Sequence, residues 1–314
     1  MGVFITGGQG YVGSHVTRLL ALQGKNPTVV DNNSGSNVFP LIPGAKYVNV
    51  SINDDSSIQV LTDLFATDPE GIVIHLSGLK SVEKSISNPE LYSKINFGST
   101  VNVLNAMKNA GLHRIIFSSS AAVYGQGESH VTENSPVTPI SQYGKIKLEE
   151  EQIIKKYVNE FSAKSAILRF FNVVGCAVPE LREINGGNVF PMITQAISRQ
   201  KKFKIFGNKY NTADGTCVRD YIDVEDVATA IEKAISKIQY SDLGVLNIGS
   251  GKPTSVLEIV KKVNKLHNFE YEFADARAGD IPQLVANISR ASADLDWTPR
   301  YGIDKSINGS FLSM

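Results

Sequence analysis

The chain alternates between short runs of apolar residues and longer amphipathic stretches in its first half. The short runs are rich in branched and aromatic side chains, which is typical of buried strands. The longer stretches repeat their apolar positions at the 3.6-residue period of a helix. Strands are therefore predicted at 3–6, 27–31, 46–50, 71–77, 114–120 and 165–171, and helices at 11–24, 55–66, 88–110 and 142–161. This alternation predicts a parallel sheet covered by helices on both faces.

The regular alternation of strand and helix patterns ends at about residue 174. The later part predicts helices at 190–200, 223–238, 255–267 and 289–295, and strands at 202–207, 218–222 and 245–250. We therefore expect an α/β fold, a doubly wound Rossmann-type parallel sheet with a smaller C-terminal α/β substrate domain. The expected division is a cofactor domain at 1–174 and a substrate domain at 175–314. Segments around 218–248 are candidates for belonging to the cofactor domain, although they follow residue 174 in the sequence.

Composition narrows the classes of partner. Lys plus Arg and Asp plus Glu both total 31 in 314 residues, so the net charge is zero and no nucleic-acid footprint is expected. No apolar run approaches the roughly 18 residues of a transmembrane helix, so no membrane contact is expected. The two cysteines and five histidines are scattered, which predicts no metal site and a reducing compartment. The amino terminus runs straight into a strand without a signal-peptide pattern, so we expect a cytoplasmic protein.

A glycine-rich turn joins the first strand to the first helix. TGGQGYVGSH (6–15) places Gly7, Gly10 and Gly13 there. Glycines let the chain turn tightly and let backbone approach a pyrophosphate, while the helix start offers unpaired N–H groups. The position between strand and helix predicts dinucleotide binding.

The residue that closes the second strand predicts which dinucleotide is bound. Asp31 lies 18 residues past Gly13, near the roughly 20 expected for an acid that binds ribose. A carboxylate accepts from ribose hydroxyls and repels a 2′-phosphate. Asn32 and Asn33 follow, with no Arg or Lys nearby, so NAD is favoured over NADP.

The stretch SQYGKIK (141–147) places a tyrosine and a lysine four residues apart. On a helix Tyr143 and Lys147 share a face, whereas Lys145 points elsewhere. A tyrosine has a resting pKa of about 10, and a neighbouring ammonium or a positive nicotinamide ring would lower it toward that of a general base. Ser120, at the end of the strand at 114–120, would donate to the same substrate hydroxyl. We predict Tyr143, Lys147 and Ser120 as the catalytic group.

These residues, in this order, are those of the short-chain dehydrogenase/reductase superfamily, extended type. Further segments run in order across most of the chain and together closely resemble the UDP-glucose 4-epimerase family. The segments are TGGQGYVGSH, HLSGLKSV, IIFSSSAAVYG, YGKIKLEEEQII, LRFFNVVG, FPMITQA, IFGNKY, DGTCVRDYIDVEDVA, LNIGSGKPTSVLEIV and RAGDIP.

The resemblance implies an isomerase that keeps its NAD bound. Tyr143 would take the proton of the sugar 4-hydroxyl while hydride passes from C4 to NAD and later returns to the other face of a 4-keto sugar. Family members commonly pair through two long helices, here 88–110 and 142–161, so a homodimer is expected. The implied cofactor contacts are Gly7, Gly10, Tyr11, Val12, Gly13, Asp31, Asn32, Ser36, Ile52, Leu76, Lys80, Asn96, Tyr143, Lys147 and Phe171.

The resemblance also implies a UDP-sugar site. Arg219 and Arg277 match diphosphate-binding arginines, Asp280 a ribose-binding carboxylate, and Leu284 lines the pocket beside the C2 substituent of the sugar. The implied substrate contacts are Ser120, Asn172, Asn188, Val189, Phe206, Arg219, Tyr221, Arg277, Asp280 and Leu284.

The chain departs from the family pattern in three places, and other readings stay open. Ser51 replaces a frequent acid near the adenine, Lys204 a usually small residue, and the tail ends at Met314. The alternatives are a UDP-N-acetylglucosamine 4-epimerase, a sugar dehydrogenase that releases its cofactor, or a non-catalytic NAD-binding sensor. Dehydratases and decarboxylases usually carry an acid after the serine segment, where SSSAAVYG has alanines.

Overall fold

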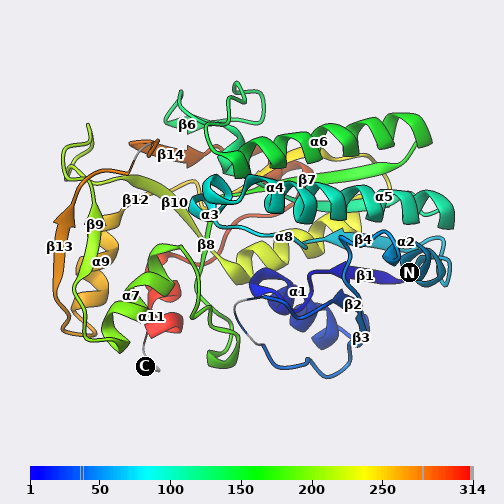
Figure 1. The fold of residues 1–314 in the computed structure, drawn as a ribbon, viewed down its shortest axis with the longest axis horizontal. Coiled ribbons are helices and arrows are strands. Elements are labelled where there is room, and N and C mark those ends of the chain that lie inside the picture. Colours follow the sequence, from blue (N-terminus) through cyan, green and yellow to red (C-terminus); the bar gives the residue numbers. More distant parts are fainter. Residues whose placement is uncertain (36, 38, 278, 312–314) are drawn as a thin grey trace.

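The computed structural model describes residues 1–35, 37, 39–277 and 279–311. Its largest element is a seven-stranded sheet in the order β11-β7-β5-β4-β1-β2-β3, and all of its neighbouring strands are parallel (Figure 1). The strands are β1 (Val3–Thr6), β2 (Thr28–Asp31), β3 (Lys46–Asn49), β4 (Ile72–His75), β5 (Arg114–Ser120), β7 (Lys164–Phe170) and β11 (Gly244–Ile248).

Helices cover both faces of this sheet, because successive strand residues point to opposite sides. Ile5 packs into a core with α1 (Tyr11–Leu22) and α8 (Val224–Lys237). Its neighbour Phe4 packs into a second core with α2 (Ser57–Phe65), α5 (Gly98–Ala110) and α6 (Gln142–Phe161). The predicted doubly wound parallel sheet is therefore confirmed. No helix of the described residues is both long and apolar enough to cross a membrane.

A smaller α/β part lies at one end of the molecule, at the left in Figure 1. A five-stranded sheet runs β12-β10-β14-β6 with β8 also paired to β10, and β9 pairs with β13. The elements of this smaller part are β6 (His130–Val131), β8 (Asn172–Val174), β9 (Phe203–Phe206), β10 (Val218–Asp223), β12 (Pro253–Ser255), β13 (Tyr271–Ala274), β14 (Gln283–Ala286), α7 (Val189–Ser198), α9 (Val256–Asn264) and α11 (Ile303–Phe311). A third core, mainly of Phe, Ile, Leu and Val side chains, packs α7, α9 and α11 against β8, β9 and β10. Strands β6 and β14 contribute to a separate, smaller cluster. Helix α10 (Ser289–Leu295) packs instead on α8 and β11 of the larger part.

The structure differs from the sequence-based expectation in several segments. The helix expected at 88–110 is helical from Pro89 onward but contains a π-helical turn, η1 (Ser93–Phe97), between α4 (Pro89–Tyr92) and α5. A short helix α3 (Val82–Ser87), the 3-10 turns η2 (Ala121–Val123) and η3 (Pro179–Leu181), helix α11 and the strands β6, β8, β12, β13 and β14 were not predicted. β11 joins the large sheet beside β7, whereas β10 belongs to the smaller sheet. The division at residue 174 stays a prediction.

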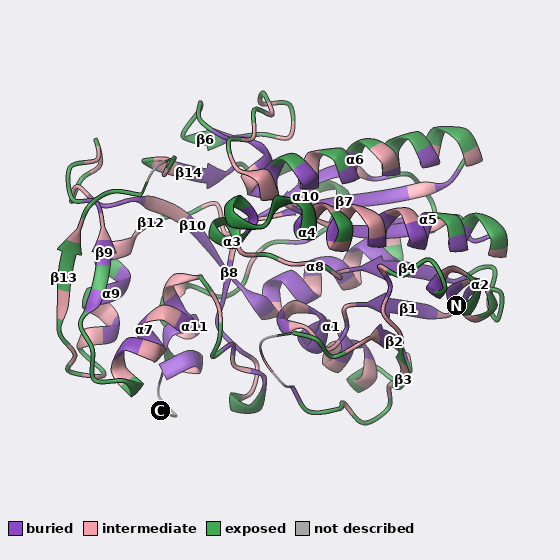
Figure 2. Cartoon of the chain, in the orientation of Figure 1, coloured by how far each residue is buried: buried purple, intermediate pink, exposed green. Residues whose placement is uncertain are grey.

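Helix α6 shows how one helix separates buried from exposed charge. Its side toward the sheet is buried and its outer side is exposed (Figure 2). The Ser141 hydroxyl caps its start by accepting from the Gly144 N–H at 3.0 Å. Lys147 is buried and Lys145 is exposed, as the helical spacing predicts.

Candidate active site

The glycine turn after β1 forms an open helix start. Gly7 has a φ of +72°, a left-handed conformation that favours glycine. A Cβ at Gly13 would lie 2.1 Å from the Gly7 carbonyl oxygen, so α1 can pack this close only without a side chain. Gly10 begins the helix without a side-chain cap, and the first turn carries no acid. Because these N–H groups lack a capping side chain, the turn fits the pyrophosphate of a dinucleotide.

Asp31 lies beside this turn at the carboxyl end of β2. Its carboxylate accepts from the backbone N–H of Gln9 at 2.9 Å and of Asn33 at 2.8 Å. The Asn32 amide donates to the Ser51 hydroxyl at 2.9 Å. Ser51, the residue that departs from the family pattern, therefore fixes the side chain next to Asp31. The predicted contact Ile52 follows β3 and is buried, whereas Ser36 lies outside the described residues.

The segment after β4 is held by Asn96 and Lys80. The buried Asn96 amide accepts from the Leu79 N–H at 2.8 Å and donates to the Leu79 carbonyl at 2.9 Å. Lys80 forms an ion pair with the buried carboxylate of Glu183 and lies 5.2 Å from the centre of the Tyr11 ring. Both predicted cofactor contacts are thus also engaged with the protein itself. The Leu76 N–H bonds to Thr6 at 2.9 Å, so β1 and β4 end together.

The predicted catalytic residues gather where β5 ends and α6 begins. Ser120 ends β5 and caps η2 by accepting from the Ala122 N–H at 3.2 Å. A Cβ at Gly144 would lie 2.4 Å from the Ala122 carbonyl oxygen, so glycine allows α6 to start directly against this turn. That close approach places Tyr143 beside Ser120, whose hydroxyl acts to lower the pKa of the tyrosine.

The electrostatic surroundings of Tyr143 contain opposing charges. Burial raises the pKa of Tyr143 above its usual value and Glu150 raises it further, while Lys147 and the Ser120 hydrogen bond lower it. Lys147 therefore acts in the predicted direction, but the net shift of this tyrosine pKa is upward because burial outweighs it. Glu150, whose carboxylate lies 3.1 Å from the Lys147 ammonium, was missed at the sequence level.

The sugar end of the predicted substrate site is largely apolar. Leu284 is buried in a cluster with Ala121, Tyr124 and Phe171, next to the turn that carries Ser120. Leu284 pairs with Arg219 across β14 and β10, and Tyr221 of β10 pairs with Asn172 of β8. The Asn172 amide donates to the Asp220 carbonyl at 3.2 Å. The packing of Leu284 in the cluster with Ala121 therefore connects the catalytic turn to the smaller part of the molecule.

The nucleotide end carries two arginines in different settings. Arg219 donates to the Ile281 carbonyl at 2.5 Å and approaches the Asp280 carboxylate at 3.8 Å. The exposed Arg277 stacks its guanidinium 3.9 Å from the centre of the Phe206 ring. Asn188 and Val189 lie at the start of α7, where Asn188 forms no side-chain cap.

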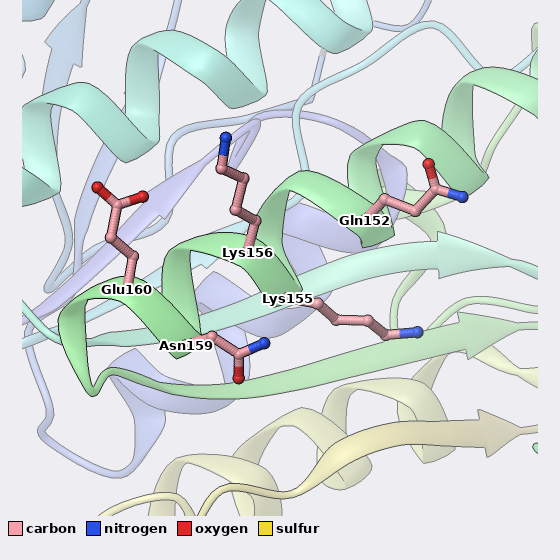
Figure 3. A pocket seen from close by; sticks show the side chains of 5 residues that line it. All are labelled: Gln152, Lys155, Lys156, Asn159 and Glu160. Carbon is pink, nitrogen blue, oxygen red and sulfur yellow. The ribbon is translucent and has the colours of Figure 1, made fainter.

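A shallow surface pocket lies along the second half of α6, away from these residues. Its side chains are polar or charged and none is a predicted site residue (Figure 3). The lining residues are Gln152, Lys155, Lys156, Asn159 and Glu160. This pocket is therefore distinct from the candidate active site.

Comparison with known proteins identifies the family. Residues 3–249 match the NAD dependent epimerase/dehydratase family. The UDP-glucose 4-epimerase of Bacillus subtilis is 37% identical over 322 residues, covering 97% of this chain and 94% of the relative. The structure of UDP-glucose 4-epimerase from Bifidobacterium longum in complex with NAD⁺ and UDP matches with a TM-score of 0.89 and 31% identity, covering 99% of this chain and 97% of that one.

A second solved structure is equally similar in fold. UDP-glucose 4-epimerase from Stenotrophomonas maltophila, with bound NAD and formylated UDP-arabinopyranose, has a TM-score of 0.90 and 30% identity, covering 99% of this chain and 97% of its own. With a family match over residues 3–249 and 37% identity to a full-length relative, the chain belongs to the NAD dependent epimerase/dehydratase family.

Proposed function

We propose that the protein is a UDP-glucose 4-epimerase that interconverts UDP-glucose and UDP-galactose with NAD kept bound. The observation that carries the proposal is the placement of Tyr143 against Ser120 and one helical turn from Lys147, at the sheet edge that also holds the glycine turn. Relatives named for this activity cover almost the whole chain. NAD is the cofactor of the family.

In this proposal Tyr143 acts as the general base on the 4-hydroxyl of the sugar. Bound NAD supplies a hydride acceptor at C4 and later a donor to the other face. Ser120 donates to the same hydroxyl oxygen and fixes its direction, while Lys147 contributes positive charge that favours the phenolate. When the sugar has turned over, Tyr143 returns the proton to the 4-oxygen.

The substrate would be held firmly at its nucleotide and loosely at its sugar. Arg219 and Arg277 suit the diphosphate because guanidinium groups give charge-assisted, forked hydrogen bonds to its oxygens. Asp280 suits the uridine ribose, and Phe206 offers an aromatic face to the uracil. The hexose would lie against the Leu284 cluster, whose side chains offer few hydrogen bonds and so allow the sugar to rotate.

Three other functions have weaker support. A dehydratase needs a further acid beside the serine segment, but Ala121 and Ala122 occupy those positions. A non-catalytic NAD sensor has no use for a tyrosine and a lysine on one helix face. A UDP-N-acetylglucosamine 4-epimerase differs only in the width of the sugar pocket, where Leu284 is intermediate in bulk.

We also propose a homodimer in a reducing, cytoplasmic compartment. The partner would pack on the outer sides of α5 and α6, which expose Asn105, Lys108, Lys156 and Glu160. Because salt screens the charges among these side chains, the dimer should weaken as the salt concentration rises, which light scattering at low and high salt measures. Cys176 and Cys217 are both free and buried, which suits a reducing compartment.

The test is incubation of the purified protein with UDP-galactose, without added NAD, and chromatography of the products. We expect UDP-glucose to form and the Tyr143→Phe protein to form at least about 10²-fold less per unit time. A folded protein that gives no UDP-glucose even with NAD supplied contradicts the proposal. Formation of a dehydrated or oxidised sugar would assign the protein to one of the other activities.

A further inference from the structure

A line of buried polar side chains runs from the first strand to Lys147. The Thr6 hydroxyl lies 2.6 Å from His75 Nδ1, and His75 Nε2 lies 3.0 Å from the Thr100 hydroxyl. Thr100 donates to Glu150 Oε1 at 2.6 Å, and Glu150 Oε2 lies 3.1 Å from Lys147 Nζ. Lys147 is 4% exposed and the other four are 0% exposed, so water does not screen the line.

The direction of the hydrogen bonds follows from the donors that each group possesses. Burial, helped by the charge of Lys147, lowers the pKa of His75 to about 3, so its ring is neutral and carries one N–H. Thr100 has a single O–H and gives it to the Glu150 carboxylate, so Thr100 accepts from His75 Nε2. His75 Nδ1 then accepts from Thr6. Every hydrogen therefore points toward Glu150, as an ionised carboxylate requires.

Glu150 is also the counter-charge of Lys147. Their ion pair is fully buried, where one charge without the other would be costly. The Lys147 ammonium lies 4.6 Å from the centre of the Phe117 ring, so packing and charge both restrict it. The carboxylate thus determines where the ammonium lies and how much of its charge Tyr143 experiences.

We propose that Glu150 is a positioning residue for the reaction, holding Lys147 in place and offsetting its charge beside Tyr143. Without that negative charge, Tyr143 should ionise at a lower pH. The proposal rests on the proposed role of Tyr143 as general base. Tyr143 and Glu150 are seven residues apart on α6, two turns or about 10.5 Å of rise. At an effective dielectric constant of about 20, one charge at that distance moves a titration by about one pH unit.

The other charged groups around α6 do not replace Glu150. Glu151 is committed to Arg169 of β7 through two hydrogen bonds of 2.9 and 2.7 Å. The remaining titratable groups on packed elements are neutral tyrosines, exposed side chains, or residues at the far ends of strands. They are Tyr92 and Glu90 on α4, Tyr124 after η2, Glu83 and Lys84 on α3, Lys94 on η1, Lys108 on α5, Arg114 at the start of β5 and Lys164 at the start of β7.

The experiment compares Glu150→Gln with the parent and with Glu149→Gln, which removes the same charge from an exposed neighbour. The first readout is the tyrosinate absorbance of the protein as purified, followed against pH. Subtracting the curve of the same protein with Tyr143→Phe leaves the titration of Tyr143 alone. The second is the pH dependence of kcat. We expect Glu150→Gln to move the Tyr143 titration and the rising limb of kcat about one pH unit lower, and Glu149→Gln to move both by less than about 0.3 unit.

Two further variants distinguish a specific effect of the Glu150 carboxylate from an unspecific disturbance of the fold. Glu150→Asp keeps the charge and should restore most of the parent titration. Thr100→Val removes the hydrogen bond that supports the carboxylate, so it should shift the titration in the same direction as Glu150→Gln but less, and it carries the test if the glutamine protein does not fold. An unchanged Tyr143 titration in Glu150→Gln overturns the proposal. If Glu150→Gln does not fold, an unchanged Tyr143 titration in Thr100→Val overturns it. If the parent lacks epimerase activity and Glu150→Gln still shifts the Tyr143 titration, the result supports the positioning role of Glu150 and refutes the proposed function.

Discussion

Replacing Glu151 by glutamine would remove one negative charge from the interior while keeping the shape of the side chain. Glu151 is fully buried and accepts from the Arg169 Nε at 2.9 Å, from the Arg169 Nη2 at 2.7 Å and from the Ser119 hydroxyl at 2.5 Å. A carboxylate only accepts, whereas a glutamine amide has one oxygen and one NH₂ group. Whichever way the amide is turned, its NH₂ faces a donor.

The cost of this change follows from the guanidinium that is left behind. Burial works to lower the pKa of Arg169, but the hydrogen bonds and charge of Glu151 hold it above its usual value. Without Glu151 the arginine keeps its charge and has no counter-ion, which costs about 3–5 kcal/mol for a buried pair. Glutamine still offers one oxygen, so we expect the lower end, about 3 kcal/mol. With an unfolding entropy of about 2.1 cal/mol/K per residue over 314 residues, Tm should fall by about 5 °C.

The assay is thermal unfolding followed by circular dichroism, with Glu149→Gln as the matched control on the exposed side of α6. We expect the control to melt within about 1 °C of the parent, because exposed charges contribute little. The double variant Glu151→Leu with Arg169→Met removes both charges and should melt above Glu151→Gln. Equal melting of Glu151→Gln and the control would refute the reasoning.

Three further predictions concern the site. Lys147→Ala should reduce both kcat and the amount of NAD that copurifies, whereas Lys145→Ala, on the exposed side, should change neither; equal losses in steady-state kinetics and cofactor content would contradict the assignment by helix face. The depressed pKa of His75, about 3, contributes stability that is complete above pH about 6.5 and is lost as the pH falls toward 3. Urea unfolding should therefore show the free energy of unfolding falling by up to about 1.4 kcal/mol per pH unit from this group, and His75→Gln should flatten the slope by that amount; an unaltered slope would show that His75 is not the group. Leu284 should make the N-acetylated sugar pair slower by about 1–3 kcal/mol in activation free energy, with Leu284→Ser raising N-acetyl activity and Leu284→Tyr preserving activity on plain hexoses. Kinetics on both sugar pairs check this, and a parent enzyme that handles them equally would remove leucine as the gate.

The sequence was sufficient for features that depend on local geometry. Strand and helix periods predicted the doubly wound sheet, and the glycine spacing predicted the open start of α1. The four-residue spacing of Tyr143 and Lys147 predicted which lysine is buried, because side-chain direction on a helix is fixed by the backbone.

Features that depend on tertiary pairing were not predictable in the same way. Glu150 looks like one member of the acidic run LEEEQ, and only the packing of α5 and β5 against α6 makes it the buried partner of Lys147. A spacing of three from Lys147 was the available signal. Glu183 lies in a loop without periodic pattern, so its pairing with Lys80 had no local signal. The strands β6 and β8 span two and three residues, too few to show an alternation.

The place of β11 in the large sheet has a consequence for how the protein is made on the ribosome. The strand that covers the outer edge of β7 comes from residues 244–248, after β8, α7, β9 and β10 of the smaller part have been synthesised. Until those residues emerge, β7 presents an unpaired edge with the sequence KSAILRF, which invites pairing with other chains. A fragment ending at residue 174 would keep that edge permanently. A stand-alone cofactor domain would therefore need α8 and β11 as well, and translation has to pass residue 248 before the sheet can close.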